Sequence, residues 1–304
     1  MFDLDIIIIT YNRPKYLHLV LQSFFKLNNY KEFRLVVLDG GNKNYKEIVG
    51  KEKLCTYDLI SKYYKDYDNF FYKNYSNNGD WAKILEDYIT NIVRAKSMVI
   101  VGDDDNFINL EGFKQASEEI KNNNKISICN ISYKDNILKK VTRPEYDLIN
   151  GNDYIKNFIS KEYINSQSVM HFFNVDRIKK NESMFFLNLR SRGLEDFFGW
   201  DMHFLFLTAM NNKVKYLEAS TALEMGARGD EIRYTVAYPL TQWLCYYIYS
   251  KYTLKKLIKK KIIKTYYKRI FLLFWINSFL ICYSKYLFSK YSTRDEDYKK
   301  VFSF

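Results

Sequence analysis

Strand and helix patterns alternate from the start of the chain, and this order determines the class of fold. Residues 4–10, LDIIIIT, form a β-branched run that is typical of a strand buried on both faces. Pro14 then opens a pattern of apolar residues at helical spacing. Because parallel strands need a crossover connection, a repeated strand–helix order predicts an α/β fold with a parallel sheet.

The same reasoning predicts strands and helices up to residue 291. The other expected strands are 33–39, 70–73, 97–101, 125–133, 167–174 and 213–218. The expected helices follow Pro14 and lie around 44–65, at 81–95 and at 194–211, with a helical pattern over 237–291. Beyond residue 125 the alternation is less regular, which favours some antiparallel pairing. We therefore expect one domain over 1–235 and a helical, basic and aromatic segment over 236–304.

The positive charge of the chain is concentrated in this last segment. The net charge is +12, and residues 251–304 hold 14 Lys or Arg against three acidic residues. Basic residues interleaved with aromatic ones over 251–291 suit adsorption to an anionic membrane surface. The apolar stretch 270–284 is shorter than the ~20 residues that span a bilayer. A nucleic-acid binder or a packed helical subdomain would share this composition, but no nucleic-acid-binding motif is present.

Cysteine usage and the first residues indicate a reducing compartment. The four cysteines are far apart and form no CxxC pair, so they suggest neither a zinc site nor a disulfide framework. The start of the chain, MFDLDIIII, carries acids where a signal peptide carries bases. We expect a cytoplasmic protein that lies peripherally on the inner face of the membrane.

Three consecutive carboxylates follow the strand at 97–101. Asp103, Asp104 and Asp105 repel one another unless a cation offsets their charge, and hard ions such as Mn²⁺ or Mg²⁺ prefer oxygen ligands. Ligands of open α/β sheets bind beyond the carboxyl ends of the strands, which is where this triplet lies. The pattern predicts a metal that also faces phosphate oxygens. The alternative is a solvated acidic turn before a helix that starts near Leu110.

Two other loops leave the sheet at the same predicted edge. Asp39 ends the strand 33–39 and precedes two glycines, where the backbone can approach a ligand closely. It could accept hydrogen bonds from a ribose or a base, or it could form an Asx turn. The first loop has groups that could hold a base or a phosphate, or it could simply start the helix. Its candidate residues are Thr10, Tyr11 and Arg13.

Two more candidate elements lie further along the chain. Glu195 and Asp196 begin an aromatic helical pattern, and burial among rings would raise the pKa of a carboxylate towards that of a general base. Their alternative role is stabilisation of a helix N-terminus. The glycine-containing stretch 225–234 carries Arg228, which could close over a diphosphate or lie in a plain surface loop.

Five motifs in this order resemble those of the family 2 glycosyltransferases, which have a GT-A fold. They are IIIITYNRP, VVLDGG, NNGDWAKILEDYI, VGDDDNF and GLEDFFGWD, and the resemblance covers about residues 4–235. It implies a Rossmann-like sheet with helices on both faces and a nucleotide-diphosphate sugar donor. It also implies a divalent metal held by a DxD motif and a single displacement with inversion at the anomeric carbon.

The resemblance implies a donor-binding role for the early loops. Thr10, Tyr11 and Arg13 would surround the nucleoside, and Asp39 would contact its base or ribose. Asp104 would lie beside the bound sugar nucleotide.

The resemblance also implies the residues of the reaction itself. Asp103 and Asp105 would be the two ends of the DxD motif and would hold Mn²⁺ or Mg²⁺, with Asp105 as the direct ligand. Asp196 would deprotonate the acceptor hydroxyl with support from Glu195. Arg228 and the metal would stabilise the leaving diphosphate.

Departures from the family pattern narrow the expected reaction. Gly40 stands where the family usually has a second acid, and the QxxRW-type motif of processive polymerases is absent. We expect transfer of a single sugar to a hydroxyl of a glycan or lipid-linked acceptor, in bacterial-type surface polysaccharide or lipooligosaccharide biosynthesis. The alternatives are a non-catalytic sugar-nucleotide-binding protein and a nucleic-acid binder that uses the basic tail, although no nucleic-acid partner is expected.

Overall fold

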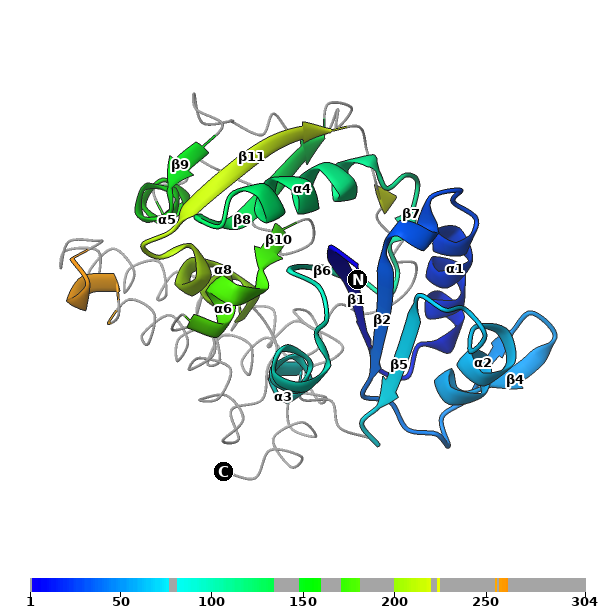
Figure 1. Cartoon of the computed structure of the whole chain (residues 1–304). Coiled ribbons are helices and arrows are strands. Elements are labelled where there is room, and N and C mark those ends of the chain that lie inside the picture. The colour runs from blue at the N-terminus through cyan, green and yellow to red at the C-terminus, as the bar shows by residue number, and fades with distance from the viewer. Residues whose placement is uncertain are drawn as a thin grey trace, which may run out of the picture.

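The central feature is a sheet of eight strands in the order β5-β2-β1-β6-β10-β8-β11-β9, with helices on both of its faces (Figure 1). The computed structural model describes residues 2–76, 81–133, 148–159, 171–180, 200–219, 223–224, 255 and 257–261. The strands of the sheet are β1 (Leu4–Thr10), β2 (Arg34–Asp39), β5 (Phe70–Asn74), β6 (Ser97–Val101), β8 (Ile126–Tyr133), β9 (Leu148–Asn150), β10 (His171–Asn174) and β11 (Lys213–Ala219).

The helices and the short strands complete the described part of the chain. The α-helices are α1 (Pro14–Phe25), α2 (Thr56–Tyr63), α3 (Trp81–Asp87), α4 (Glu111–Asn122), α5 (Gly151–Ile159), α6 (Val175–Lys180) and α8 (Trp200–Ala209). Two antiparallel pairs stand apart from the main sheet, namely β3 (Glu47–Val49) with β4 (Glu52–Leu54) and β7 (Asn106–Phe107) with β12 (Leu223–Glu224).

The amino-terminal half of the sheet is parallel, which confirms the prediction from the strand–helix alternation. β1 pairs with β2 and with β6, and β2 pairs with β5, all in parallel. Every residue of β1, β2 and β6 is buried, as strands covered by helices on both faces require. Pro14 begins α1, where its missing N–H costs no hydrogen bond.

The second half of the sheet mixes strand directions, as the less regular sequence pattern indicates. β10 is antiparallel to β6 and to β8. β11 is parallel to β8 and antiparallel to the edge strand β9. The parallel half therefore ends at β6, which lies beside an antiparallel neighbour.

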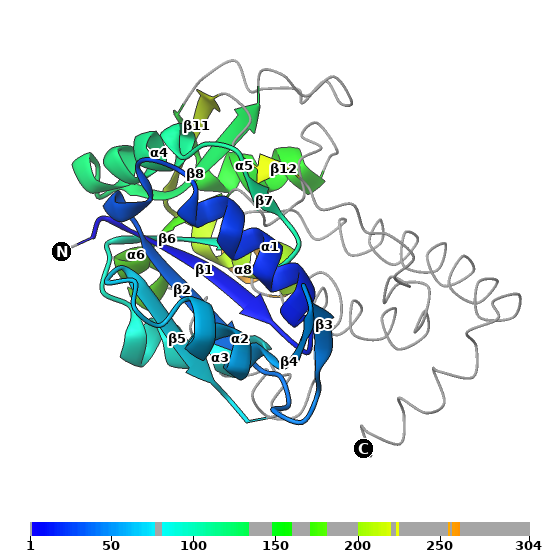
Figure 2. The ribbon, with the colours of Figure 1, turned by 90° about the vertical axis from the view of Figure 1, so that its right-hand side faces the viewer.

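Alternate residues of the parallel strands contribute to two separate cores. Ile7 and Val36 face a cluster that includes α3, α5, α6 and α8, whereas Ile8 and Val37 face a cluster that includes α1, α2 and α4. Figure 2 shows α1 and α2 lying in front of the sheet on this second side. The period of two along each strand explains why a run without polar alternation still forms a strand.

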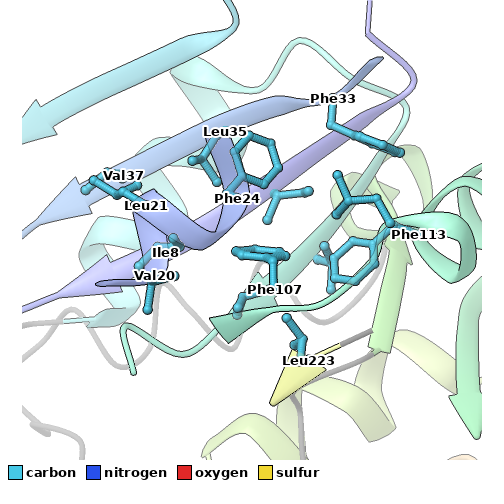
Figure 3. Close-up of a cluster of buried hydrophobic side chains, with 14 of the residues drawn as sticks. Ile8, Val20, Leu21, Phe24, Phe33, Leu35, Val37, Phe107, Phe113 and Leu223 are labelled. Carbon is cyan, nitrogen blue, oxygen red and sulfur yellow. The ribbon is translucent and has the colours of Figure 1, made fainter. Parts of the chain in front are cut away.

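Aromatic rings anchor the segment that follows the acidic triplet. Phe107 of β7 packs edge-on against Phe24 of α1, with ring centroids 5.2 Å apart, and its centroid lies 5.8 Å from that of Phe113 of α4 (Figure 3). Its backbone N–H donates to the hydroxyl of Ser23 at 2.8 Å. The loop between β6 and β7 is therefore held at both ends by buried structure.

The prediction of one helix around 44–65 is wrong in its first half. Residues Glu47–Leu54 form the hairpin β3–β4, and the helix α2 occupies only Thr56–Tyr63. Gly50 in the turn has φ of 63°, a left-handed conformation that glycine adopts without steric cost. Cys55 caps the helix by accepting a hydrogen bond from the N–H of Asp58, so α2 begins only after the hairpin.

The helix expected at 81–95 is shorter than predicted. It consists of α3 and a π-helical turn, η2 (Tyr88–Ile92). Residues 167–170 and 194–199 of the expected elements, the boundary near 235 and most of the segment 237–291 lie outside the described residues, so those predictions stay open. Within the described ranges, no helix has the length and apolar content needed to cross a membrane.

A buried ion pair lies at the amino end of the parallel strands. The Oδ2 atom of Asp5 accepts hydrogen bonds from Nη1 of Arg34 at 3.1 Å and from the hydroxyl of Tyr88 at 2.8 Å. Asp5 is fully buried and Arg34 is only 5% exposed. Burial raises the pKa of Asp5, and the guanidinium of Arg34 acts in the opposite direction.

Removing the carboxylate of Asp5 should strongly destabilise the fold. The Asp5→Ala variant leaves the charge of Arg34 buried without its partner, and we expect its free energy of unfolding to fall by about 3–5 kcal/mol. Asp3→Ala is the matched control, because Asp3 pairs with Lys121 at 2.8 Å with both side chains more than 40% exposed, and such pairs contribute about 1 kcal/mol or less. Urea unfolding measures both values, and equal losses would contradict the role given to Asp5.

His18 should make the stability of the protein depend on pH. Its Nδ1 atom is hydrogen bonded to the hydroxyl of Tyr64 at 2.9 Å, and burial lowers its pKa from the ordinary 6.5. The unfolded chain therefore takes up the proton first, so the stabilising contribution is present above pH 6.5 and is lost as the pH falls through the lowered pKa. Urea unfolding between about pH 7.5 and 5.5 should show a steeper loss in the wild type than in His18→Gln, and parallel curves would contradict this assignment.

Candidate functional site

Three loops meet at the carboxyl edge of the parallel strands. They follow β1, β2 and β6, as the sequence predicts. The N–H of Gly40 donates to the carbonyl of Thr10 at 2.9 Å, and the N–H of Asn42 donates to Oδ1 of Asn12 at 2.8 Å. Asn12 has φ of 53°, a left-handed conformation that asparagine tolerates better than most residues. The first loop therefore turns sharply and contacts the second loop.

Asp103 connects the first loop to the acidic loop. Its Oδ2 accepts a hydrogen bond from the hydroxyl of Thr10 at 2.8 Å, and its Oδ1 pairs with Nη1 of Arg13 at 2.5 Å. Nη2 of the same arginine lies 3.3 Å from Oδ2 of Asp104. The structure thus brings together four of the predicted site residues, Thr10, Arg13, Asp103 and Asp104. Tyr11, the remaining predicted residue of the first loop, is 37% exposed.

Asp105 turns back towards the start of its own loop. Its Oδ2 accepts a hydrogen bond from the N–H of Gly102 at 3.1 Å, and the residue is only 2% exposed. A Cβ atom added at Gly102 would lie 2.6 Å from Oδ2 of Asp105 and 3.0 Å from Oδ1 of Asp104. Two carboxylates therefore fold around a position that only glycine can occupy without displacing them.

Asp39 is held by three donors at the end of β2. Its Oδ1 accepts from the N–H of Gly41 at 2.7 Å, and its Oδ2 accepts from the hydroxyl of Tyr72 at 2.8 Å and from Nδ2 of Asn74 at 2.7 Å. Burial and the carboxylate of Asp39 raise the pKa of Tyr72, so its hydroxyl keeps the proton that it donates. The carboxylate has a fixed orientation before any ligand arrives.

The sequence analysis missed Tyr72 and Asn74 as site residues. The predicted parallel sheet could have pointed to these two residues. The strand 70–73 was expected, and in a parallel sheet its carboxyl end lies on the same side as Asp39. In the structure Asp39 pairs in register with Asn74. The order of the strands, which the sequence alone did not provide, makes β5 the neighbour of β2.

The oxygen donors of this loop fit a hard divalent cation. Arg13 supplies one positive charge to a run of three carboxylates, and a divalent ion would further lower their mutual repulsion. Both oxygens of Asp103 accept hydrogen bonds, and Oδ2 of Asp105 accepts one from the N–H of Gly102, so an ion at either residue would share these oxygens with their present donors. Within the described ranges, no group of three His, Cys, Asp or Glu residues is arranged to hold a metal by itself. A metal here would need a ligand from another source, such as a phosphate.

The other predicted site residues lie outside the described part of the chain. These are Glu195, Asp196 and Arg228. Their roles as base, supporting acid and diphosphate contact remain predictions.

A sequence model and several solved structures are similar to this chain. The model described as Glycosyl transferase family 2 matches residues 5–214. No curated protein matches the chain. The structure of S. aureus TarS 1–349 in complex with UDP-GlcNAc is 17% identical, with a TM-score of 0.57 over 82% of this chain and 65% of that one.

Two further TarS structures are similar over the same share of this chain, 82%. TarS 1–349 alone is 16% identical with a TM-score of 0.54, and the chain covers 64% of its length. A longer TarS structure is 17% identical with the same TM-score, and the chain covers 39% of it. The chain therefore spans less than two-thirds of each of these proteins, and likeness at such identity establishes the fold alone.

The contact between Arg13 and Asp103 should be energetically coupled. In a double-mutant cycle with Arg13→Gln and Asp103→Asn, we expect a coupling free energy of roughly 0.5–3 kcal/mol, because each single change leaves a charged partner in a partly buried place. Urea unfolding of the four proteins measures it.

A matched cycle combines Arg13→Gln with Glu32→Gln, since Glu32 pairs with Lys114 in an exposed bridge. That cycle should be additive within about 0.5 kcal/mol. Additivity in the first cycle as well would contradict the role of Asp103 in fastening the two loops.

Proposed function

The chain belongs to glycosyl transferase family 2, and from that premise we propose that it transfers a sugar from a nucleotide-diphosphate donor to an acceptor hydroxyl. The observation that carries the proposal is the meeting of three loops at one edge of the sheet. Thr10, Asp39 and Asp103 end or follow adjacent parallel strands there, and all three are less than 8% exposed. Buried polar groups at a carboxyl edge are the usual setting for nucleotide binding in α/β sheets.

The proposed donor is a uridine diphosphate sugar. TarS has been crystallised with UDP-GlcNAc and with UDP, which supports a donor of this class for a chain with the same fold. Asp39, fixed by Tyr72 and Asn74, would accept hydrogen bonds from the ribose or the base. Because the carboxylate is already oriented, little conformational entropy is lost when the nucleoside binds.

The acidic loop would face the diphosphate of the donor. Asp105, with Asp103 beside it, would hold Mn²⁺ or Mg²⁺, and such an ion would neutralise charge on the leaving diphosphate. Arg13 keeps Asp103 and Asp104 in place, so the loop has a defined shape. We assign the diphosphate contact from the 225–234 loop to Arg228.

The proposed reaction is a single displacement with inversion, and Asp196 is the proposed base. The Asp196 carboxylate would take the proton of the acceptor hydroxyl as the hydroxyl oxygen attacks the anomeric carbon, while Glu195 supports that carboxylate. The bond to the diphosphate breaks in the same step. The proposed acceptor is a glycan or a lipid-linked glycan of surface polysaccharide synthesis, and the basic segment 251–291 would hold the enzyme at the inner face of the membrane.

Some variants should lose donor binding, whereas another should bind the donor and lose only its turnover. UDP-GlcNAc with Mn²⁺ should raise the melting temperature of the wild type, since a ligand at about 100 times its Kd adds about 2.7 kcal/mol to the folded state. Asp105→Asn should lose the Mn²⁺-dependent part of the shift, and Asp39→Asn should weaken binding with or without Mn²⁺. Asp196→Asn should keep the full shift but lose donor turnover by about 10²–10⁴-fold.

The control variant is Asp66→Asn, which removes an exposed carboxylate of the same type from the turn after α2 and should behave as the wild type. Absence of any shift with uridine, guanosine or thymidine nucleotide sugars would contradict the donor site. A normal shift with no turnover in the wild type would favour a sugar-nucleotide-binding protein without catalysis.

A further inference from the structure

A pocket of about 400 Å³ lies at the amino ends of the parallel strands. The proposed donor site lies at their carboxyl ends. Its lining residues are Phe2, Arg34, Asp68, Phe70, Phe71 and Arg94. Arg34 is the first residue of β2 and Asp39 is the last, so a rise of about 3.3 Å per residue separates the two sites by about 17 Å. The volume is in the range of pockets that hold small ligands.

Arg34 presents an open hydrogen-bonding edge to this pocket. Its Nη1 donates to Oδ2 of Asp5 and to the carbonyl of Ile92, both at 3.1 Å, and the ring of Phe71 lies 5.0 Å from its Cζ. The Nε and Nη2 atoms form no hydrogen bond with the described residues. Neither atom is completely shielded from solvent. This edge of a guanidinium is the fork that binds a carboxylate or phosphate through two parallel hydrogen bonds.

The ion pair with Asp5 explains why Arg34 is buried but not why its second edge is open. A purely structural arginine in so buried a position would be expected to use its remaining N–H groups on the protein, because buried donors are nearly always paired. Here those groups meet a pocket instead. The rigid contacts on Nη1 also fix the direction of the open edge, so a ligand would find it already oriented.

A second cation and an apolar wall complete the pocket. Arg94 donates its backbone N–H to Asp5, and its exposed guanidinium forms no hydrogen bond or ion pair with the described residues. Phe2, Phe70 and Phe71 are each partly exposed and provide ring surface beside the two guanidinium groups. Asp68 is exposed at the same pocket and is the only acidic residue among the described lining residues.

We propose that this pocket binds a small organic anion in which a phosphate or carboxylate carries a flat apolar group. Arg34 holds the anionic group through its Nε–Nη2 edge, and Arg94 adds a second charge-assisted contact. The phenylalanine rings cover the apolar group. The site is distinct from the donor edge, and the proposal does not depend on the proposed transferase activity.

Isothermal titration with phenyl phosphate tests the proposal on the full chain. We expect one saturable site, with phenyl phosphate bound at least about fivefold more tightly than inorganic phosphate because only the former buries apolar surface on the rings. Arg94→Gln should weaken binding by about tenfold, since it removes a charge-assisted contact. Asp68→Asn should tighten binding by about two- to fivefold, since it removes a like charge.

The variants are chosen so that folding does not confuse the result. The side chains of Arg94 and Asp68 are exposed and make no hydrogen bond or ion pair in the structure, unlike that of Arg34. Lys96→Gln removes an exposed cation close to Arg94 in the chain but outside the pocket lining, and it should leave the affinity unchanged. Opposite shifts in Arg94→Gln and Asp68→Asn would support the site.

Three results would overturn the proposal. One is the absence of saturable phenyl phosphate binding up to about 10 mM. Another is binding that neither Arg94→Gln nor Asp68→Asn changes, which would place the probe elsewhere on the protein. The third is equal affinity for phenyl phosphate and inorganic phosphate, which would remove the role of the phenylalanine wall.

Discussion

The carboxylate of Asp103 fastens the ends of the neighbouring strands β1 and β6 to each other. It accepts hydrogen bonds from Thr10, the last residue of β1, and from Arg13 in the loop that follows, while its own loop follows β6. Three loops could otherwise leave the sheet in unrelated directions, because the strands fix only their starting points. This contact holds the acidic loop against the first loop, and the hydrogen bonds from Gly40 and Asn42 hold the second loop against the first.

Buried charged groups are paired differently at the amino and carboxyl ends of the parallel strands. At the amino edge Asp5 and Arg34 form a buried pair that also involves Tyr88, and Arg34 lines a pocket as well. At the carboxyl edge, Arg13 pairs with Asp103 and Asp104, the first two of three consecutive carboxylates. The first arrangement is close to neutral and ties strands together, whereas the second gathers three consecutive carboxylates in the loop where we propose that a cation and a diphosphate bind.

The errors of sequence interpretation have local physical causes. The hairpin Glu47–Leu54 consists of two strands of three residues each, which are too short to show a period of two, so the helical pattern of α2 was extended across them. Gly50 was the signal for the turn. Tyr72 and Asn74 were missed for another reason, because a tyrosine or an asparagine at a strand end has no role until the neighbouring strand is known.

The sequence by itself determined the parallel α/β sheet, the edge at which the ligand loops lie and the residue types that could act there. Continuous apolar strands, helical periodicity and the acidic triplet are local signals, so no neighbour in space is needed to read them. Only the tertiary structure decided which groups meet. The order of the strands brought Tyr72 and Asn74 to Asp39, paired Arg13 with Asp103 and opened the second edge of Arg34 to a pocket, because these contacts join residues that only folding brings together.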